Sequence, residues 1–128
     1  MKLLSDVENF FSPTRDKLSK HLGAYEKVDV IFSVYKDAKL SELVTNICLT
    51  FVNGLLSKAQ CEDKPENGLY TVPFEAPGEI YEKIFVEKKL TLGEAMYDGM
   101  AICPEEKSKH NLVVATCQTI RELQNNRV

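Results

Sequence analysis

The N-terminal third of the chain changes from a helical to a strand-like spacing of apolar residues. Over residues 2–11, apolar positions recur every three or four residues, which predicts a short amphipathic helix. The Ser-Pro pair that follows is typical of a helix start and Gly23 of a helix end, so we expect a second helix and a helical arm over residues 1–24. Residues 27–35 alternate between strongly apolar and mixed positions, which predicts a strand.

The long apolar stretch that comes next fits two structures. Residues 40–47 follow the 3.6-residue period of a helix, and Asn53-Gly54 is typical of a helix end. Residues that favour strands dominate 44–56, however, and Asn-Gly is also the strongest short signal of a β-hairpin. We expect the helix and leave the strand alternative open for 44–56. The same choice stays open for 79–90 and 111–117, where we also expect helices.

Polar residues separate this stretch from the second half of the chain. The segment 57–68 carries Pro65 and an Asn-Gly pair, which predicts a surface loop within one domain. The six residues that follow, 69–74, predict a short strand. Pro73 confines that strand to an edge of the sheet, because proline has no N–H to donate to a neighbouring strand.

The remaining elements are short until the last helix. Thr91 and Glu94 have the spacing of a capping box, so we expect a short helix there. The apolar residues 100–103 predict a brief strand. Pro104 is followed by two glutamates and predicts the start of the final helix, because proline suits the first helical position and acidic residues suit the positive end of the helix dipole.

These elements predict an α+β fold. We expect a single compact domain over residues 1–128 that is mainly helical, with a small two- to three-stranded sheet. A chain of 128 residues with 44% hydrophobic residues has the size and composition of one globular domain.

The charge pattern argues against nucleic acid and membranes as partners. The net charge is −3, and acidic and basic residues are interspersed along the sequence, so no large field of one sign attracts phosphates. A basic cluster at residues 15–21 could contact phosphates, but Asp16 interrupts it and no aromatic platform adjoins it. No apolar segment approaches the roughly 20 residues of a membrane span. We therefore expect a cytoplasmic protein with no membrane contact.

The four cysteines do not follow a metal or disulfide pattern. The nearest two are thirteen positions apart, whereas thiolate zinc sites bring their ligands in close pairs. We expect reduced thiols, no bound metal and no cofactor. The sequence also lacks the signatures of phosphate loops, dinucleotide sites and serine nucleophiles.

Cys103 is a weak candidate for a catalytic residue. A cysteine at the start of a helix is activated when the helix dipole lowers its pKa. Glu105 and Glu106 oppose that effect, because a second negative charge beside them is disfavoured. His110 lies seven residues further on, which is roughly 10 Å along a helix and too far for direct proton transfer. We assign no catalytic residue, and we rank a thiol-dependent enzyme or redox sensor that uses Cys103 second among the functions.

Aromatic residues provide better candidates for a binding surface. Tyrosine and phenylalanine are enriched where protein surfaces meet, and an edge strand can accept a partner. The residues predicted to make contact are Tyr70, Phe74, Tyr81 and Tyr97. We therefore expect a non-catalytic intracellular regulatory or inhibitory module that acts through protein–protein contact, either with another protein or with a second copy as a homo-oligomer. A nucleic-acid-binding protein ranks third.

Overall fold

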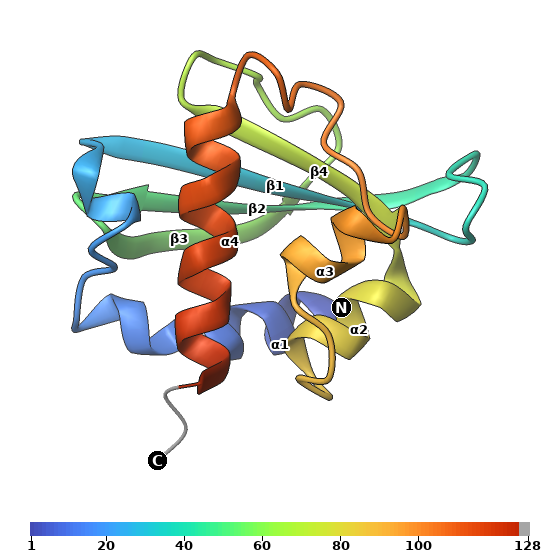
Figure 1. Cartoon of the computed structure of the whole chain (residues 1–128), viewed down its shortest axis with the longest axis horizontal. Coiled ribbons are helices and arrows are strands. Elements are labelled where there is room, and N and C mark those ends of the chain that lie inside the picture. The colour runs from blue at the N-terminus through green and yellow to red at the C-terminus, as the bar shows by residue number, and fades with distance from the viewer. Residues whose placement is uncertain (126–128) are drawn as a thin grey trace.

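The computed structural model describes residues 1–125 and contains a four-stranded mixed sheet (Figure 1). The strands are β1 (Lys27–Tyr35), β2 (Leu43–Val52), β3 (Leu55–Glu62) and β4 (Thr71–Pro77). Their order in the sheet is β3-β2-β1-β4. β1, β2 and β3 pair antiparallel, whereas β4 pairs parallel with β1. β4 therefore lies at an edge of the sheet, as Pro73 predicts.

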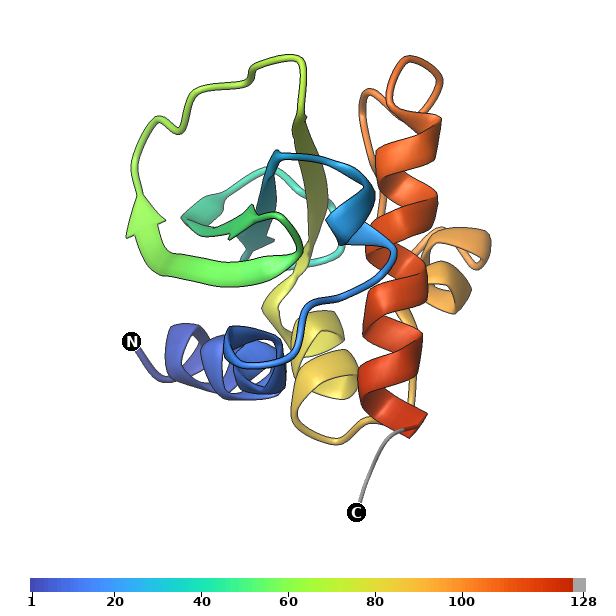
Figure 2. The same ribbon diagram turned by 90° about the vertical axis from the view of Figure 1, so that its left-hand side faces the viewer.

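The α-helices of the described segment lie on one side of the sheet (Figures 1 and 2). They are α1 (Lys2–Phe11), α2 (Gly78–Phe85), α3 (Leu92–Tyr97) and α4 (His110–Asn125). Two 3-10 helices, η1 (Ser12–Arg15) and η2 (Leu22–Ala24), lie between α1 and β1. α4 runs across the strands, and α3 packs beside it.

The core fills the space between these helices and the sheet. Alternate residues of β1 point to this side and are buried: Val28, Val30, Phe32 and Val34. Phe32 is the centre of an aromatic cluster, with its ring centroid 5.1 Å from that of Phe85 and 5.5 Å from that of Tyr81. The Tyr81 hydroxyl donates to the carbonyl of Ser33, so the polar atom of this fully buried ring has a partner.

Residues 43–52 form β2, so the helix expected over 40–52 is wrong and the hairpin alternative is correct. Asn53 and Gly54 make the turn to β3 with φ values of 51° and 84°, and positive φ at both central residues is what a type I′ hairpin turn requires. The turn also contacts the N-terminal segment, because the backbone N–H of Ser19 donates to the carbonyl of Gly54 at 2.9 Å.

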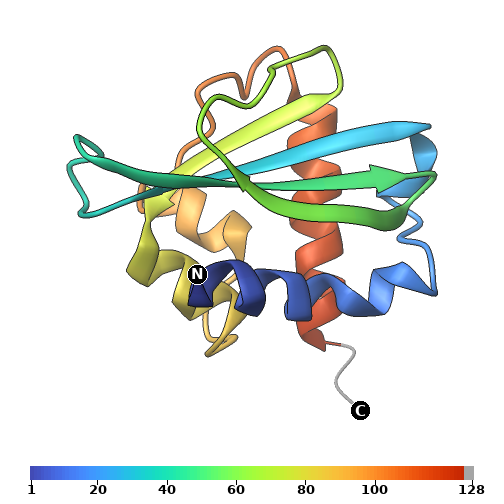
Figure 3. The same ribbon diagram turned by 180° about the vertical axis from the view of Figure 1, so that it is seen from behind.

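β2 is covered on both faces, which explains why its sequence also fits a helix. Ile47 faces the helices and is fully buried, and Cys48 on the opposite face is only 6% exposed. On that opposite side, Asn46 donates to two backbone carbonyls at the end of β3, and segment 63–70 crosses over to β4 (Figure 3). A strand covered on both faces loses the apolar–polar alternation that would identify it.

The loop between β3 and β4 is shorter than the predicted 57–68, because β3 takes the first part of that range. Segment 63–70 is held in place by Lys109, whose ammonium donates to the Asn67 side chain at 2.6 Å and to two backbone carbonyls. Lys109 also pairs with Glu105 at 3.3 Å. The turn before α4 is thereby fastened to the crossover.

The α+β class is as predicted, but the prediction of a mainly helical chain with two or three strands is wrong. Helix accounts for 38% of the chain and strand for 28%, in a four-stranded sheet. The helix expected over 12–23 is replaced by η1 and η2, because Leu18 of its expected apolar stripe is 54% exposed and does not join the core. The strand expected at 100–103 is reduced to one bridge, between Glu75 and Ile102.

The elements with strong local signals lie where the sequence predicts them. α1 coincides with 2–11, β1 with 27–35, and 111–117 is helical within α4. α2 occupies the first part of 79–90. The capping box is present, since the Thr91 hydroxyl accepts from the Glu94 N–H at 3.1 Å and the Glu94 carboxylate accepts from the Thr91 N–H at 2.9 Å.

Replacing Thr91 with alanine is expected to lower the free energy of unfolding by about 1 kcal/mol, because the hydroxyl that caps α3 is lost. Thr91→Ser keeps a hydroxyl at the same position and serves as the control. Denaturant melts of both variants give the comparison. Equal stability of the alanine and serine variants would contradict a stabilising role for the capping box.

Candidate functional site

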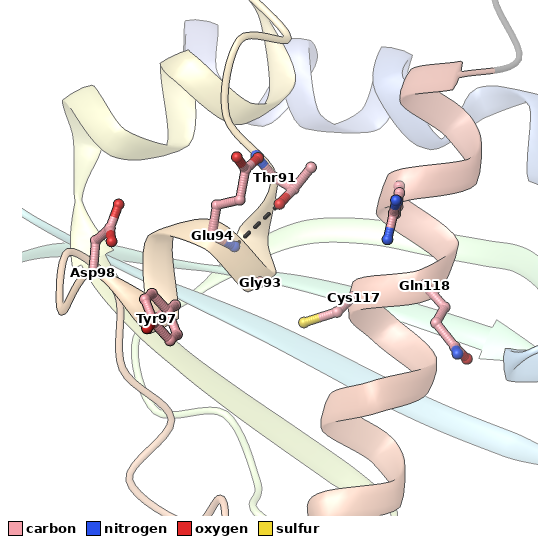
Figure 4. A pocket seen from close by; sticks show the side chains of 8 residues that line it. Thr91, Gly93, Glu94, Tyr97, Asp98, Cys117 and Gln118 are labelled. Carbon is pink, nitrogen blue, oxygen red and sulfur yellow. Dashed lines mark hydrogen bonds between the residues drawn. The ribbon is translucent and has the colours of Figure 1, made fainter.

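An open groove runs between α3 and α4 (Figure 4). It consists of two adjoining cavities of 460 and 560 Å³, which share the lining residues Gly93, Tyr97, Cys117 and Gln118. Volumes in this range are typical of sites that hold small organic ligands. The groove lies between two helices that pack against each other and against the core, so the positions of its walls are set by this packing.

The larger cavity is predominantly apolar. Glu106, His110 and Gln118 are its polar side chains, and its apolar side chains are Met96, Tyr97, Ala101, Ile102, Cys103, Val113, Val114 and Cys117. Ile102 is 41% exposed and Val114 36%, so a substantial part of each apolar side chain is in contact with solvent. Exposed apolar surface in a concave site favours a ligand that removes it from water.

The smaller cavity has charged side chains on both walls. Glu94 and Asp98 lie on the α3 side, and Arg121 lies on α4. The pKa of Glu94 is lowered, first by hydrogen bonds from Thr91 and further by the positive charge of Arg121, so this carboxylate is ionised at neutral pH. Within residues 1–125, neither Arg121 nor Asp98 forms an ion pair.

Gly93 keeps the centre of the groove open. Among the residues that the structure describes, a Cβ atom added at this position would meet only the Thr91 hydroxyl, at 4.0 Å. The Cys117 side chain points from α4 toward α3 (Figure 4). Because Gly93 has no positive φ, a larger side chain there is compatible with the helix and would occupy the groove.

The two cysteines that line the groove are held as neutral thiols. Burial raises the pKa of Cys103, and the charges of Glu106 and Glu105 raise it further, although a hydrogen bond from the Glu105 backbone acts in the opposite direction. Burial raises the pKa of Cys117 to about 11. Since the thiolate is the reactive form of cysteine, neither residue is activated as a nucleophile at neutral pH.

The sequence suggests that Cys103 lies at the start of a helix, but the structure shows that it does not. α4 begins only at His110, and residues 104–109 form turns. Pro104 and the two glutamates therefore precede the helix rather than open it, and the helix dipole acts on other residues. The side chain of Cys103 is instead buried to 8% exposure against the larger cavity.

The structure brings together two of the residues selected from the sequence. Tyr97 lines both cavities and Cys103 lines the larger one. Phe74 and Tyr81 lie in the core with no exposed surface. Tyr70 is half-exposed at a different place, with its ring 6.0 Å from that of Tyr25.

Sequence reasoning missed the other groove residues. Val114 lies beside the buried stripe of α4 and remains exposed, so the apolar surface of this helix is wider than its core-facing side; that width was the available signal. Gly93 was a second signal, because a glycine inside a helix is unfavourable unless its position has a packing or binding reason. Arg121 carried no local signal.

Another cavity, of 620 Å³, lies on the other flank of α4. Its lining includes Lys17, Lys20 and Glu122, so charged side chains interrupt its apolar surface. It also includes the buried Ser19 and Thr119 hydroxyls, which hydrogen-bond to each other at 2.8 Å. Among the described residues, no group of three or more metal-ligating side chains occurs, and no helix is both long and apolar enough to cross a bilayer.

Neither a protein-family model nor a curated protein matches this sequence. Solved structures do match the fold: sterol carrier protein 2 has a TM-score of 0.64 and 12% sequence identity, over 97% of this chain and 96% of that chain. The chain has the fold of the sterol carrier proteins. A conserved hypothetical protein from Thermus thermophilus, described as a possible sterol carrier protein, has a TM-score of 0.59 and 12% identity, over 93% of this chain and 86% of that chain.

The thiols provide a chemical test of the site geometry. At pH 7.5 the exposed Cys61 is expected to be alkylated first, and the groove residues Cys103 and Cys117 much more slowly, because both are shielded and protonated. Their rates should increase as the pH rises toward their raised pKa values. Mass spectrometry after timed alkylation gives the order of modification. Modification of Cys103 before Cys61 at pH 7.5 would contradict this description of the groove.

Proposed function

We propose that this protein is a non-catalytic binding module that holds a lipid-like small molecule in the groove between α3 and α4. The observation that carries the proposal is the exposed apolar lining of the larger cavity, with Ile102 and Val114 on its surface and the charged smaller cavity adjoining it. A ligand with an apolar body and a polar end matches this division. Burial of each methylene group of such a ligand contributes about 0.8 kcal/mol.

The likeness of fold supports the same proposal. Two of the structures that match are named as a sterol carrier protein or as a possible one. The residues of the groove add an independent reason, because their apolar character is a property of this chain and does not depend on the likeness. The raised pKa values of Cys103 and Cys117 support binding without chemistry at the thiols.

A groove-filling substitution tests the proposal. Gly93→Leu is expected to weaken binding of dodecyl maltoside, used below its micelle concentration, by about tenfold, because displacement of about two methylene groups costs roughly 1.6 kcal/mol. Stability should be unchanged or higher, since leucine favours the helix more than glycine. Ser5→Leu adds the same side chain at an exposed, uncharged position of α1 and is the matched control. Equal binding by the two variants would place the ligand elsewhere.

Thiol protection gives a second readout of the same site. Bound dodecyl maltoside is expected to slow the alkylation of Cys117, which lines both cavities, and to leave the exposed Cys61 unaffected. The effect should disappear in the Gly93→Leu variant. Equal protection of both cysteines would indicate a general change in stability rather than occupation of the groove.

Protein–protein contact is the second candidate function. Leu69 is 78% exposed and Tyr70 53%, and the two precede the edge strand β4. An exposed aliphatic and aromatic pair at a sheet edge supports contact with another protein or with a second copy. Sedimentation of the double variant Leu69→Ser and Tyr70→Ser against the natural sequence tests self-association through this surface.

The other functions considered from the sequence have less support. The raised pKa of Cys103 disfavours a thiol-dependent enzyme or redox sensor. Part of the basic cluster already has carboxylate partners, because Arg15 pairs with Glu8 and His21 lies 3.0 Å from Glu122, and this disfavours nucleic acid. All four cysteines are free, which supports a reducing compartment such as the cytoplasm as part of the proposal.

A further inference from the structure

We infer that the groove selects an amphiphile with a zwitterionic head group, whose anionic part faces Arg121 and whose cationic part faces Glu94 and Asp98. The inference rests on the proposed binding function and adds the class of head group. It follows from the placement of charges along the groove rather than from its apolar lining.

The charges of the smaller cavity lie on opposite walls. Arg121 projects from α4, whereas Glu94 and Asp98 belong to the end of the groove formed by α3. Arg121 is close enough to Glu94 to lower its pKa, yet the two are not within ion-pair distance. The space between them therefore has a positive and a negative side, and a head group with both charges complements it.

Arg121 is available for an anionic group. Within the described residues its guanidinium has no hydrogen bond or ion pair, and a guanidinium can bind two phosphate oxygens at once. The Glu94 carboxylate is already engaged with the Thr91 N–H. Asp98 has no ion pair with any residue in 1–125, so it is the freer carboxylate for a cationic group.

Tyr97 adds a surface for that cationic group. It is the residue before Asp98, lines both cavities, and is 91% exposed. A quaternary ammonium is attracted to the face of an aromatic ring and to a nearby carboxylate. The apolar side chains Met96 and Val113 lie further along the groove, where the tail would follow.

The remaining charges of the groove disfavour a purely anionic amphiphile. Glu106 lines the larger cavity together with His110, so the two cavities together carry three carboxylates, counted with Glu94 and Asp98, and one guanidinium. A fatty acid or an alkyl phosphate would gain Arg121 but would also approach this excess of negative charge. A zwitterion satisfies both sides of the groove without adding net charge.

Four amphiphiles with the same dodecyl tail separate the head group from the tail. Dodecylphosphocholine is zwitterionic, dodecyl phosphate is anionic, dodecyltrimethylammonium is cationic, and dodecyl maltoside is neutral. Calorimetric titration below each micelle concentration should give the tightest binding for dodecylphosphocholine, by about threefold or more over each of the others at low salt. Its advantage over dodecyl maltoside should decrease as salt is added, because exposed charges are screened.

Two variants that each remove one charge test which side of the groove binds which charge of the head group. Arg121→Gln should lower the affinity for dodecylphosphocholine by about threefold to tenfold and leave dodecyltrimethylammonium at least as well bound. Asp98→Asn should lower the affinity for dodecylphosphocholine and raise that for dodecyl phosphate. Lys58→Gln removes a charge on exposed β3, outside the groove, and should change none of the four affinities.

The outcomes distinguish the head-group inference from the binding function. Binding of all four amphiphiles within about twofold would overturn the head-group inference and leave the groove as an apolar site. Tighter binding of dodecyltrimethylammonium or dodecyl phosphate than of dodecylphosphocholine would also overturn it. Failure of all four, dodecyl maltoside included, would overturn the binding function and the inference with it. The salt dependence of the natural protein needs no variant, so a folding defect in one variant does not decide the result.

Discussion

Phe32→Ala is expected to lower the free energy of unfolding by about 3–5 kcal/mol, which is a large part of the stability of a domain of this size. Phe32 has no exposed surface and lies in the interior strand β1. Four aromatic rings surround it, with centroids 5.1 to 6.3 Å away: Phe11, Phe74, Tyr81 and Phe85. These rings come from α1, β4 and α2, so the substitution leaves a cavity where three elements meet.

Denaturant melts measure the effect, with Tyr97→Ala as the control. Tyr97→Ala removes a side chain similar in size to that of Phe32, but Tyr97 is 91% exposed. This substitution should therefore change the free energy of unfolding by less than about 0.5 kcal/mol. A loss below about 1 kcal/mol for Phe32→Ala would mean that the aromatic cluster is not the centre of the core.

Gly54→Ala is expected to destabilise the protein by more than the usual cost of a positive φ, which is about 1–2 kcal/mol for alanine. Gly54 has a φ of 84°, and a Cβ atom there would lie 2.6 Å from the carbonyl oxygen of Ser19 and 2.8 Å from the Cα of Gly23. Both contacts are with backbone, so the segment that includes η2 has to move away from the hairpin.

Comparison with Gly99→Ala separates the clash with the backbone from the cost of a positive φ. Gly99 also has a positive φ, of 75°, but a Cβ atom there would meet no atom of the described residues within 4 Å. Thermal or denaturant melts should show Gly54→Ala to be less stable than Gly99→Ala by at least about 1 kcal/mol. Equal losses would show that the hairpin turn and the N-terminal segment are not held in close contact.

Local signals predicted the elements whose boundaries depend on a few neighbouring residues. The capping box at Thr91, the amphipathic α1 and the alternating β1 all have such signals. Pro73 correctly predicted that β4 lies at an edge of the sheet. The absence of an N–H follows from the residue type alone, so this prediction did not require knowledge of the partner strand.

The sequence could not distinguish β2 from a helix, because the difference depends on long-range contacts. Ile47 and Cys48 are adjacent and both buried, since helices cover one face of β2 and the crossover 63–70 passes the other. An apolar run of this kind is compatible with both periods. Asn53-Gly54 was the local signal that favoured a hairpin, and the structure confirms a hairpin turn at these residues.

The candidate site was predictable only in part, because it combines residues from two helices separated in sequence. Tyr97 and Cys103 were selected for their residue types, and the structure places both at the groove. Arg121 and Val114 become relevant only through the packing of α4 against α3. Phe74 and Tyr81 were selected by the same aromatic criterion, but long-range packing places them in the core.

The groove as a binding site is tested most directly by amide chemical shifts of the ¹⁵N-labelled protein during titration with dodecylphosphocholine below its micelle concentration. We expect saturable shifts that are largest for residues 91–98, 101–103 and 113–118, which border the two cavities. Gly93→Leu should reduce them, and Ser5→Leu should not. Shifts that are absent, or that are largest at residues 13–20 or around Tyr70, would contradict binding in the groove between α3 and α4.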